Sequence, residues 1–306
     1  MEKLSKPVTE VNLPFKRLGT GKNKVREMYD LSEVVPGVGL MVNTDRISTE
    51  DVVMLTGIPD KGKVLTKVSA MIFKATKKTC PNHFITDNFK EFPEEIRKEV
   101  APFQEELFGR SMLILLAKPI KIEAIVRPFL DGSGYESYVK NGDVNGIKLP
   151  AGIQKRDQLP APIFTPTTKE SVGHDQKLTY EQFIEKVGNL STAMLIKAYS
   201  LALASEISLV LALKNIRFID TKFEFGTIHP RRAGEGVPMF LYQIDETATP
   251  DSSRYDPDYS KQPFRIAMRE IGFDGETPME IPDWLVRKTS RNYRKMCRMI
   301  TEEITI

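Results

Sequence analysis

The segment 220–226, with the sequence DTKFEFG, carries two carboxylates and one lysine at alternate positions. Side chains alternate across a β-strand, so Asp220, Lys222 and Glu224 would share one face. The opposite face would carry Phe223 and Phe225, whose size favours the core. The charged face is either solvated, with ion pairs worth about 0–1 kcal/mol, or a site for Mg²⁺ and phosphate, because carboxylate oxygens suit the metal and an ammonium suits the anion.

A second acidic pair follows the next β-patterned segment, 239–245, which ends in Asp245 and Glu246. The turn-rich stretch 226–237 separates the two segments, and this pattern predicts a β-hairpin. In a hairpin, Glu224 and Asp245 would come from neighbouring strands and could hold one cation between them. The sequence TPDSSR at 249–254 follows, and its Arg254 either binds an anion as a forked donor or belongs to an ordinary surface turn.

Two further segments could bind phosphate groups. Residues 19–26, GTGKNKVR, join glycines to cations before a predicted strand, but the spacing of a P-loop is absent. This segment is either a kinase-like flap over a nucleotide or a common basic turn. Arg127 precedes the triplet Gly132-Ser133-Gly134, a turn that either binds a phosphomonoester or serves only to reverse the chain.

The three histidines, His83, His174 and His229, lie far apart and show no metal-ligand spacing. The pair His174-Asp175 is either a proton-transfer pair or, as is more common, part of a surface loop.

The elements that must position these groups begin with a β-rich region. Short hydrophobic runs predict strands, and one apolar periodicity predicts a helix. The strands are expected at 25–31, 39–43, 113–117 and 120–126, and the helix at 64–73. We therefore expect a β-rich domain at 1–118, followed by a larger α/β domain at 119–306 with a closing helix at 282–301.

The stretch 131–178 is rich in proline and glycine, which is typical of a linker or of a long ordered loop that builds a site. Its aromatic and aliphatic residues favour the ordered loop. Thr179 and Gln182 then have capping-box spacing, and the helical periodicity that follows predicts one core helix from Thr179 to about Leu201.

Composition places these elements in an ordinary soluble protein of 306 residues, a length that predicts about two domains. A net charge of +3 does not indicate nucleic-acid binding, and two cysteines cannot build a disulfide framework. The N-terminus lacks the apolar run of a secretory signal. Lys197 and Glu206 interrupt the apolar stretch 194–213, so we expect a buried helix and no membrane span.

The motifs appear in a characteristic order: KVR at 24–26, TDRIS at 44–48, GIPDKG at 57–62, GRSM at 109–112, EAIVR at 123–127, GSG at 132–134, FTP at 164–166, and the two segments 220–226 and 249–254. As a set they resemble the phosphoribosylaminoimidazole-succinocarboxamide synthase (SAICAR synthetase) family over about residues 18–256. The resemblance implies an α+β fold, distantly kinase-like, with ATP between a small β-rich domain and a larger α/β domain.

It also implies an ATP- and Mg²⁺-dependent ligase of purine biosynthesis that joins L-aspartate to carboxyaminoimidazole ribonucleotide (CAIR) through an acyl phosphate. The expected partners are these small molecules, with no nucleic acid and no membrane, in a cytoplasmic monomer or homodimer. By the same resemblance, site residues can be assigned. The ATP-binding residues would be Lys24, Arg26, Lys118 and Glu123. Mg²⁺ would be bound by Glu224 and Asp245, with Lys222 as the third catalytic group. The residues that contact the substrate would be Arg127, Ser133, Arg254, Lys169, His174, Asp45, Arg46, Ser48, Asp51 and Asp220.

Three positions depart from the family pattern: Asn23 replaces a glycine, Tyr135 replaces a tryptophan, and the loop 226–237 carries Arg231 and Arg232. Three alternatives remain. A kinase-like phosphotransferase would need no aspartate, and a silent nucleotide-binding module should have lost Lys222, Glu224 or Asp245. A nucleic-acid binder would use the basic tail 287–298, whose spacing is also that of one solvated helix face.

Overall fold

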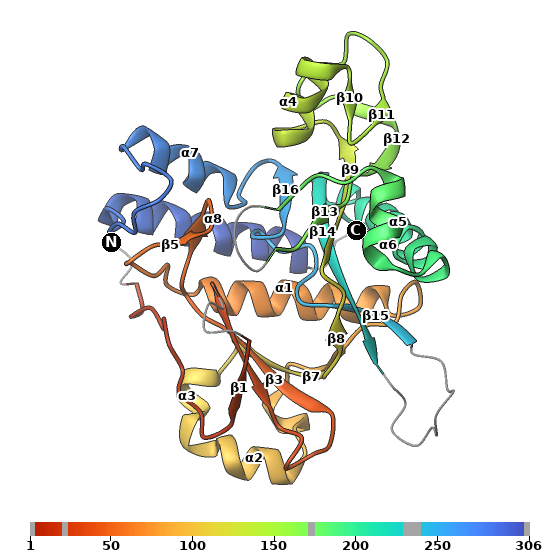
Figure 1. Cartoon of the computed structure of the whole chain (residues 1–306). Coiled ribbons are helices and arrows are strands. Elements are labelled where there is room, and N and C mark those ends of the chain that lie inside the picture. The colour runs from red at the N-terminus through yellow and green to blue at the C-terminus, as the bar shows by residue number, and fades with distance from the viewer. Residues whose placement is uncertain (1–3, 20–23, 171–174, 229–239, 303–306) are drawn as a thin grey trace.

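The computed structural model describes residues 4–19, 24–170, 175–228 and 240–302. It contains two main antiparallel sheets, and helix α1 (Lys61–Thr76) runs between them (Figure 1). One side of α1 contacts strands of the first sheet, and the rest packs with helices that cover the second. The protein is therefore an α+β molecule, as the sequence predicts.

The first sheet lies at the bottom of Figure 1 and has five strands in the order β1-β2-β3-β7-β6. They are β1 (Lys16–Leu18), β2 (Arg26–Asp30), β3 (Val38–Asn43), β7 (Ser111–Leu115) and β6 (Phe84–Thr86). Helices α2 (Glu94–Val100) and α3 (Gln104–Leu107), with two short 3₁₀ turns, Phe89–Glu91 and Ala101–Phe103, complete this part of the chain. Alternation on β3 sends Leu40 and Val42 into the core shared with α2, and Met41 to the opposite face.

The second sheet has the order β12-β9-β14-β15, and three short strands pair at its margins. Its strands are β12 (Gln158–Phe164), β9 (Ile122–Phe129), β14 (Arg217–Ile228), β15 (Phe240–Ile244), β13 (Thr167–Thr168), β16 (Ser253–Asp256) and β8 (Lys118–Pro119). β14 and β15 form the predicted hairpin, with Glu224 opposite Ile244. Gln243 of β15 also bonds through its backbone to Pro81 and His83, which joins the two sheets.

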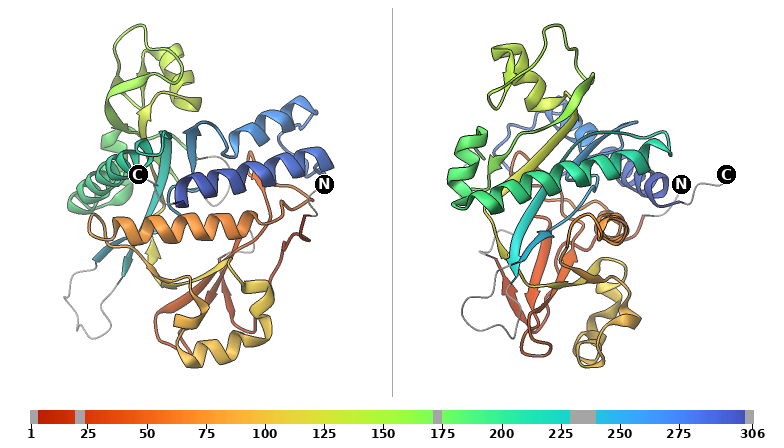
Figure 2. Two further views of the ribbon diagram at one scale, coloured as in Figure 1. Left: turned by 180° about the vertical axis from the view of Figure 1, so that it is seen from behind. Right: turned by 90° about the vertical axis from the view of Figure 1, so that its right-hand side faces the viewer.

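Helices α5 (Tyr180–Val187) and α6 (Leu190–Ala212) cover one face of the second sheet. Helices α7 (Gln262–Glu270) and α8 (Asp283–Thr301) follow, and α8 lies beside α1 (Figure 2). Four short strands, β4 (Ser48–Thr49), β5 (Val52–Val53), β10 (Asp143–Val144) and β11 (Ile147–Lys148), form two small hairpins.

The helix predicted from Thr179 begins as expected but is not continuous. Thr179 and Gln182 form the complete capping box of α5. Gly188 then adopts a positive φ of 73°, which ends α5, and Asn189 caps a new helix, α6. The break turns the second helix about its axis, so that three residues of the predicted core periodicity, Leu190, Met194 and Leu195, are exposed. The prediction of one core helix was therefore wrong at this glycine.

Helix α6 is long and apolar enough to span a membrane by length and composition alone, and 33% of that stretch is buried. Its buried face includes Ala193, Ile196 and Leu203, and it packs against β9 and β14. This is the packing of a helix that covers a sheet with one face. The sequence predicted a buried helix, whereas Met194, Leu195 and Leu209 are exposed.

The stretch 131–178 is ordered in its described residues and is not a linker. It contains helix α4 (Gly132–Asn141) and the strands β10 to β13. Leu130, Val144 and Leu159 form a small core of their own, against which Tyr135 and Tyr138 pack. The sequence predicted a turn at Gly132-Ser133-Gly134. These residues instead form the first turn of helix α4, which Asp131 caps.

Candidate functional site

Strand β14 carries the charged groups in the middle of the second sheet. Phe223 and Phe225 are buried in the large core beneath the helices, as their alternation predicts. Asp220, Lys222 and Glu224 occupy the other face. At about 3.3 Å per residue, Asp220 and Glu224 are about 13 Å apart along the strand. Each of these two residues is the centre of a separate charged cluster.

The first cluster forms around Glu224 and Asp245, which the hairpin register brings together at the end of β15. Lys169 donates to Glu224, and Arg26 donates to Asp245. Burial and the charge of Asp245 raise the pKa of Glu224 to about 7. Burial opposes ionisation of Asp245 as well, but the charges of Arg26 and Lys169 hold its pKa well below the ordinary value. The negative charge of Asp245 thus acts on Glu224 across the hairpin.

Lys222 lies beside the same carboxylates. Its ammonium group donates to Glu123 on the neighbouring strand β9 and lies 3.9 Å from Oε1 of Glu224. Burial would lower the pKa of Lys222, but the charges of Glu123 and Glu224 raise it above its ordinary value. Asp175 faces this group too: burial raises the pKa of its carboxyl, and the charge of Glu123 adds to the effect. Lys222 is therefore a permanent cation next to the two paired carboxylates.

Arg26 connects the first sheet to this cluster. Besides Asp245, its guanidinium binds Glu246, with 2.6 Å between Nη2 and Oε1. His83 lies on the same side, with Nε2 3.3 Å from the backbone oxygen of Asp245. Burial lowers the pKa of His83 to about 4, which keeps the ring neutral at pH 7. Sequence reasoning assigned no role to Glu246, although it adjoins Asp245, and an isolated histidine such as His83 offers no spacing signal.

The second cluster is built around the buried carboxylate of Asp220. Its Oδ2 accepts from Nη1 of Arg127 at 2.8 Å and from Nη1 of Arg254 at 2.6 Å. Arg127 also donates to Thr165 at 3.0 Å and to Oγ of Ser133 at 3.4 Å. Two arginines and a hydroxyl at the first turn of α4 are the donors that a phosphate monoester needs. The predicted anion-binding residues therefore lie together.

The two glycines of the Gly-Ser-Gly motif make this arrangement possible. A Cβ on Gly132, which has a φ of +53°, would lie 2.6 Å from Nη2 of Arg254. A Cβ on Gly134 would lie 3.0 Å from Cδ of Arg127. Each glycine lets one arginine pass close to the helix backbone, so the motif shapes the anion site through the absence of side chains.

The residues predicted near the N-terminal domain occupy different environments. Lys24 pairs with Asp51 at 2.6 Å, and both are about half exposed. Arg46 donates to Glu27 at 2.6 Å and to the backbone of the N-terminal segment. Ser48 is buried in β4. These contacts hold the segment beside Arg26 in place.

Asp45 is fully buried, and its environment does not suit the predicted contact with a ligand. Its oxygens accept from Arg110 at 2.9 and 3.2 Å, from the amide of Gly62 at 2.8 Å and from the amide of Val8 at 2.8 Å. These partners saturate the carboxylate. Asp45 instead fixes the start of α1 against the first sheet, a role that only the packing reveals.

Some predicted positions lie away from these contacts or outside the described residues. Lys118 is exposed on β8, next to the β14–β15 hairpin. His174, Asn23 and the segment with Arg231 and Arg232 lie outside the described residues.

The carboxylates suit a divalent cation that arrives with its own ligands. Within the described ranges, no group of three or more His, Cys, Asp and Glu side chains is arranged to hold a metal by itself. Mg²⁺ in phosphate-transfer sites is held by one or two carboxylates, with phosphate oxygens and water as further ligands. Glu224 and Asp245 supply such a pair, and a cation between them would offset the burial and the repulsion from Asp245 that together raise the pKa of Glu224.

The fold and these two clusters define an α+β protein that carries a paired-carboxylate site and an arginine-lined anion site on one sheet. The SAICAR synthase from Saccharomyces cerevisiae, solved in complex with SAICAR, superposes with a TM-score of 0.80 at 30% identity and covers 98% of this chain and 100% of its own. A SAICAR synthetase in complex with ADP shares the fold, with a TM-score of 0.64 at 19% identity, over 94% of this chain and 98% of its own.

Sequence relatives agree with the structural ones. The phosphoribosylaminoimidazole-succinocarboxamide synthase of Thermodesulfovibrio yellowstonii is 38% identical, and the match covers 96% of this chain and 98% of the relative. That of Geotalea uraniireducens is also 38% identical, over 97% and 99%. The family model for SAICAR synthetase matches residues 19–274. The chain belongs to the SAICAR synthetase family, which confirms the resemblance drawn from the motifs.

Proposed function

We propose that the protein is an ATP-dependent ligase that joins the amine of L-aspartate to the carboxylate of CAIR and releases SAICAR, ADP and phosphate. Family membership supports this reaction, and so does the likeness to the yeast enzyme, which was solved with SAICAR and is 30% identical. The observation that carries the proposal is the placement of the two clusters on one face of β14. They are about 13 Å apart, a separation on the scale of a ribonucleotide.

The chemistry explains why both clusters are needed. A carboxylate is a poor acceptor for an amine, so its oxygen first attacks the γ-phosphorus of ATP, which forms an acyl phosphate and releases ADP. The amine of aspartate then attacks the acyl carbon, and the C–O bond to phosphate breaks. In such a reaction the protein mainly positions the reactants and neutralises charge.

The anion cluster would hold the ribonucleotide. Arg127, Arg254 and Ser133 would bind its 5′-phosphate, and Asp220 keeps both guanidinium groups pointed at one place. This anchor would set the imidazole carboxylate over the middle of β14, because the phosphate and the base are at opposite ends of the molecule.

The carboxylate cluster would hold the nucleotide phosphates. Glu224 and Asp245 would hold Mg²⁺, which would supply positive charge to neutralise the phosphates. Lys222 would stabilise the phosphoryl group in transfer, with Lys169 beside it. Arg26 contributes from the first sheet, so the nucleotide would lie between the proposed domains 1–118 and 119–306. The same cleft would be bordered by Lys24, Lys118, Glu123, Arg46, Ser48 and Asp51.

The test is the release of ADP by the purified protein with ATP and Mg²⁺, with and without CAIR and aspartate. We expect turnover only when both co-substrates are present. Glu224→Gln should abolish most of it, whereas Glu105→Gln, an exposed glutamate on α3, should not.

Other outcomes point to the alternatives. ADP release that needs CAIR but not aspartate would indicate a kinase-like phosphotransferase. Tight ATP binding without turnover under any condition would indicate a silent module. We also propose that the ligase acts on small molecules in the cytoplasm, as a monomer or a homodimer.

A further inference from the structure

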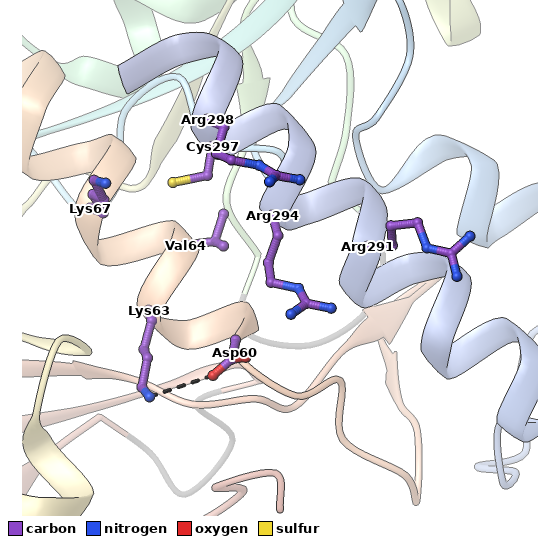
Figure 3. A pocket seen from close by; sticks show the side chains of 8 residues that line it. All are labelled: Asp60, Lys63, Val64, Lys67, Arg291, Arg294, Cys297 and Arg298. Carbon is purple, nitrogen blue, oxygen red and sulfur yellow. Dashed lines mark ion pairs between the residues drawn. The ribbon is translucent and has the colours of Figure 1, made fainter. Parts of the chain in front are cut away.

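A cavity of about 370 Å³ lies between helices α1 and α8 (Figure 3). Its lining combines five cationic side chains with one carboxylate, one thiol and one apolar side chain. They are Lys63, Lys67, Arg291, Arg294, Arg298, Asp60, Cys297 and Val64. The volume is within the range of cavities that bind small molecules.

Three of the five cationic side chains of this cavity have no ion-pair partner in the part of the chain that the structure describes. Lys63 pairs with Asp60 at 3.5 Å. Lys67, Arg291 and Arg298 make no ion pair with any residue in the described ranges. The N-terminus of α1 adds the positive end of a helix dipole beside Lys63. Clustered like charges destabilise a folded chain, and an anionic ligand is what would neutralise them.

The cavity is separate from the substrate site. Ser69 on α1 faces that site, because its hydroxyl accepts from the amide of Thr247, two residues after Asp245. At about 100° per residue, Lys63 and Lys67 project from α1 about 120° and about 160° away from Ser69. A ligand in the cavity would therefore lie behind α1 and would not compete for the β14 clusters.

The spacing of the cations indicates the kind of ligand. Arg291 and Arg298 are seven residues apart, which is about 10 Å along α8. At this spacing the two guanidinium groups suit separate phosphate groups of one chain better than a single phosphate. The cavity is concave, and the lysines on α1 face the arginines on α8, so a chain of phosphates would be enclosed from both sides. A surface that binds nucleic acid needs no such enclosure.

We propose that the cavity between α1 and α8 is a second, non-catalytic binding site for a small molecule that carries two or more linked phosphate groups. The basic residues of the tail 287–298, which the sequence predicts to form a solvated helix face, would thus bind this ligand together with the lysines of α1.

The experiment uses inorganic triphosphate as the probe and Cys297 as a reporter within the cavity. The thiol of Cys297 points into the space between the helices (Figure 3), and the only other cysteine, Cys80, is fully buried elsewhere. Alkylation of both thiols by iodoacetamide is followed by mass spectrometry at low ionic strength. At a probe concentration ten times Kd, alkylation of Cys297 should slow about tenfold, with no change at Cys80.

Matched charge reversals locate the binding. Arg291→Glu with Arg298→Glu should remove the protection of Cys297, whereas Lys288→Glu with Lys90→Glu, an equal change at two exposed lysines outside the cavity, should retain it. Arg291→Gln with Arg298→Gln provides a milder pair should the reversal impair folding. Unchanged CAIR-dependent ADP release in each variant would show that the substrate site is intact.

Three results would overturn the proposal. The first is protection that survives the loss of both arginines. The second is equal protection by orthophosphate at the same concentration, which would exclude a requirement for linked phosphates. The third is protection by a long single-stranded RNA but not by triphosphate, which would assign the surface to nucleic acid.

Discussion

Replacing Gly132 by alanine should weaken binding of the ribonucleotide without touching any charged group. The new Cβ would lie 2.6, 2.8 and 2.9 Å from the three terminal atoms Nη2, Cζ and Nη1 of Arg254. Atoms do not approach so closely, so the guanidinium must move. Its 2.6 Å hydrogen bond to Asp220 and its place at the start of α4 would both change.

The magnitude has two parts, which a second glycine separates. Gly132 has a φ of +53°, and an L-residue there costs about 1–2 kcal/mol of folding stability. Gly142, at the other end of α4, has a φ of +73° with no atom within 4 Å of an added Cβ. Gly142→Ala should therefore lose the same folding stability through its backbone and nothing more. A misplaced arginine loses a charge-assisted contact worth about 1.5–3 kcal/mol, or about 10- to 100-fold in affinity.

The assay measures the KM for CAIR and for ATP in both variants, with urea denaturation as the stability readout. We expect similar losses of stability, a rise of about 10- to 100-fold in the CAIR KM for Gly132→Ala alone, and little change in the ATP KM. Equal CAIR KM values for Gly132→Ala and Gly142→Ala would refute the reasoning, because they would show that Arg254 does not hold the ribonucleotide phosphate from this position.

Three further predictions concern buried ionisable groups. Glu224→Gln and Asp245→Asn should each lower turnover by about 10²-fold or more through lost metal positioning, and near-normal turnover in both would remove these residues from the metal site. Asp251→Asn should destabilise the fold by about 3–5 kcal/mol in urea denaturation, because the carboxylate lies 2.8 Å from the fully buried ammonium of Lys61; a change below about 1 kcal/mol would contradict that pairing. Burial lowers the pKa of His83 to about 4, so its contribution to stability is present above its unfolded pKa of about 6.5 and is lost as the pH falls towards 4. Unfolding of His83→Gln should therefore depend less steeply on pH in that window, and an unchanged slope would exclude His83 as its source.

Much of the fold could be predicted because local patterns report local structure. The alternation at 220–226 predicted the buried face of β14, and Thr179 with Gln182 predicted the start of α5 correctly. The hairpin of β14 and β15 followed from two β-patterned runs and the turn between them. The same local approach failed at Gly188, because periodicity alone cannot tell a continuous helix from two helices whose faces are rotated.

The candidate site was predictable to a different degree. The order of the motifs was enough to recognise the family and to nominate Glu224, Asp245, Arg127 and Arg254. The individual roles of these residues stay predictions. Asp45 was the clearest failure, since a conspicuous carboxylate within a motif is saturated by internal donors.

The sequence by itself therefore determined the family, through that resemblance the α+β class, and the face on which the charges of β14 lie, because motif order and strand alternation depend on residue type and short spacing. Tertiary structure alone decided which charges meet. The pairing of Arg26 with Asp245 joins residues 219 positions apart, and the cationic cavity joins α1 to α8 across a similar distance. Such contacts depend on how whole helices and strands pack, and no local pattern in the chain specifies which distant residues will meet.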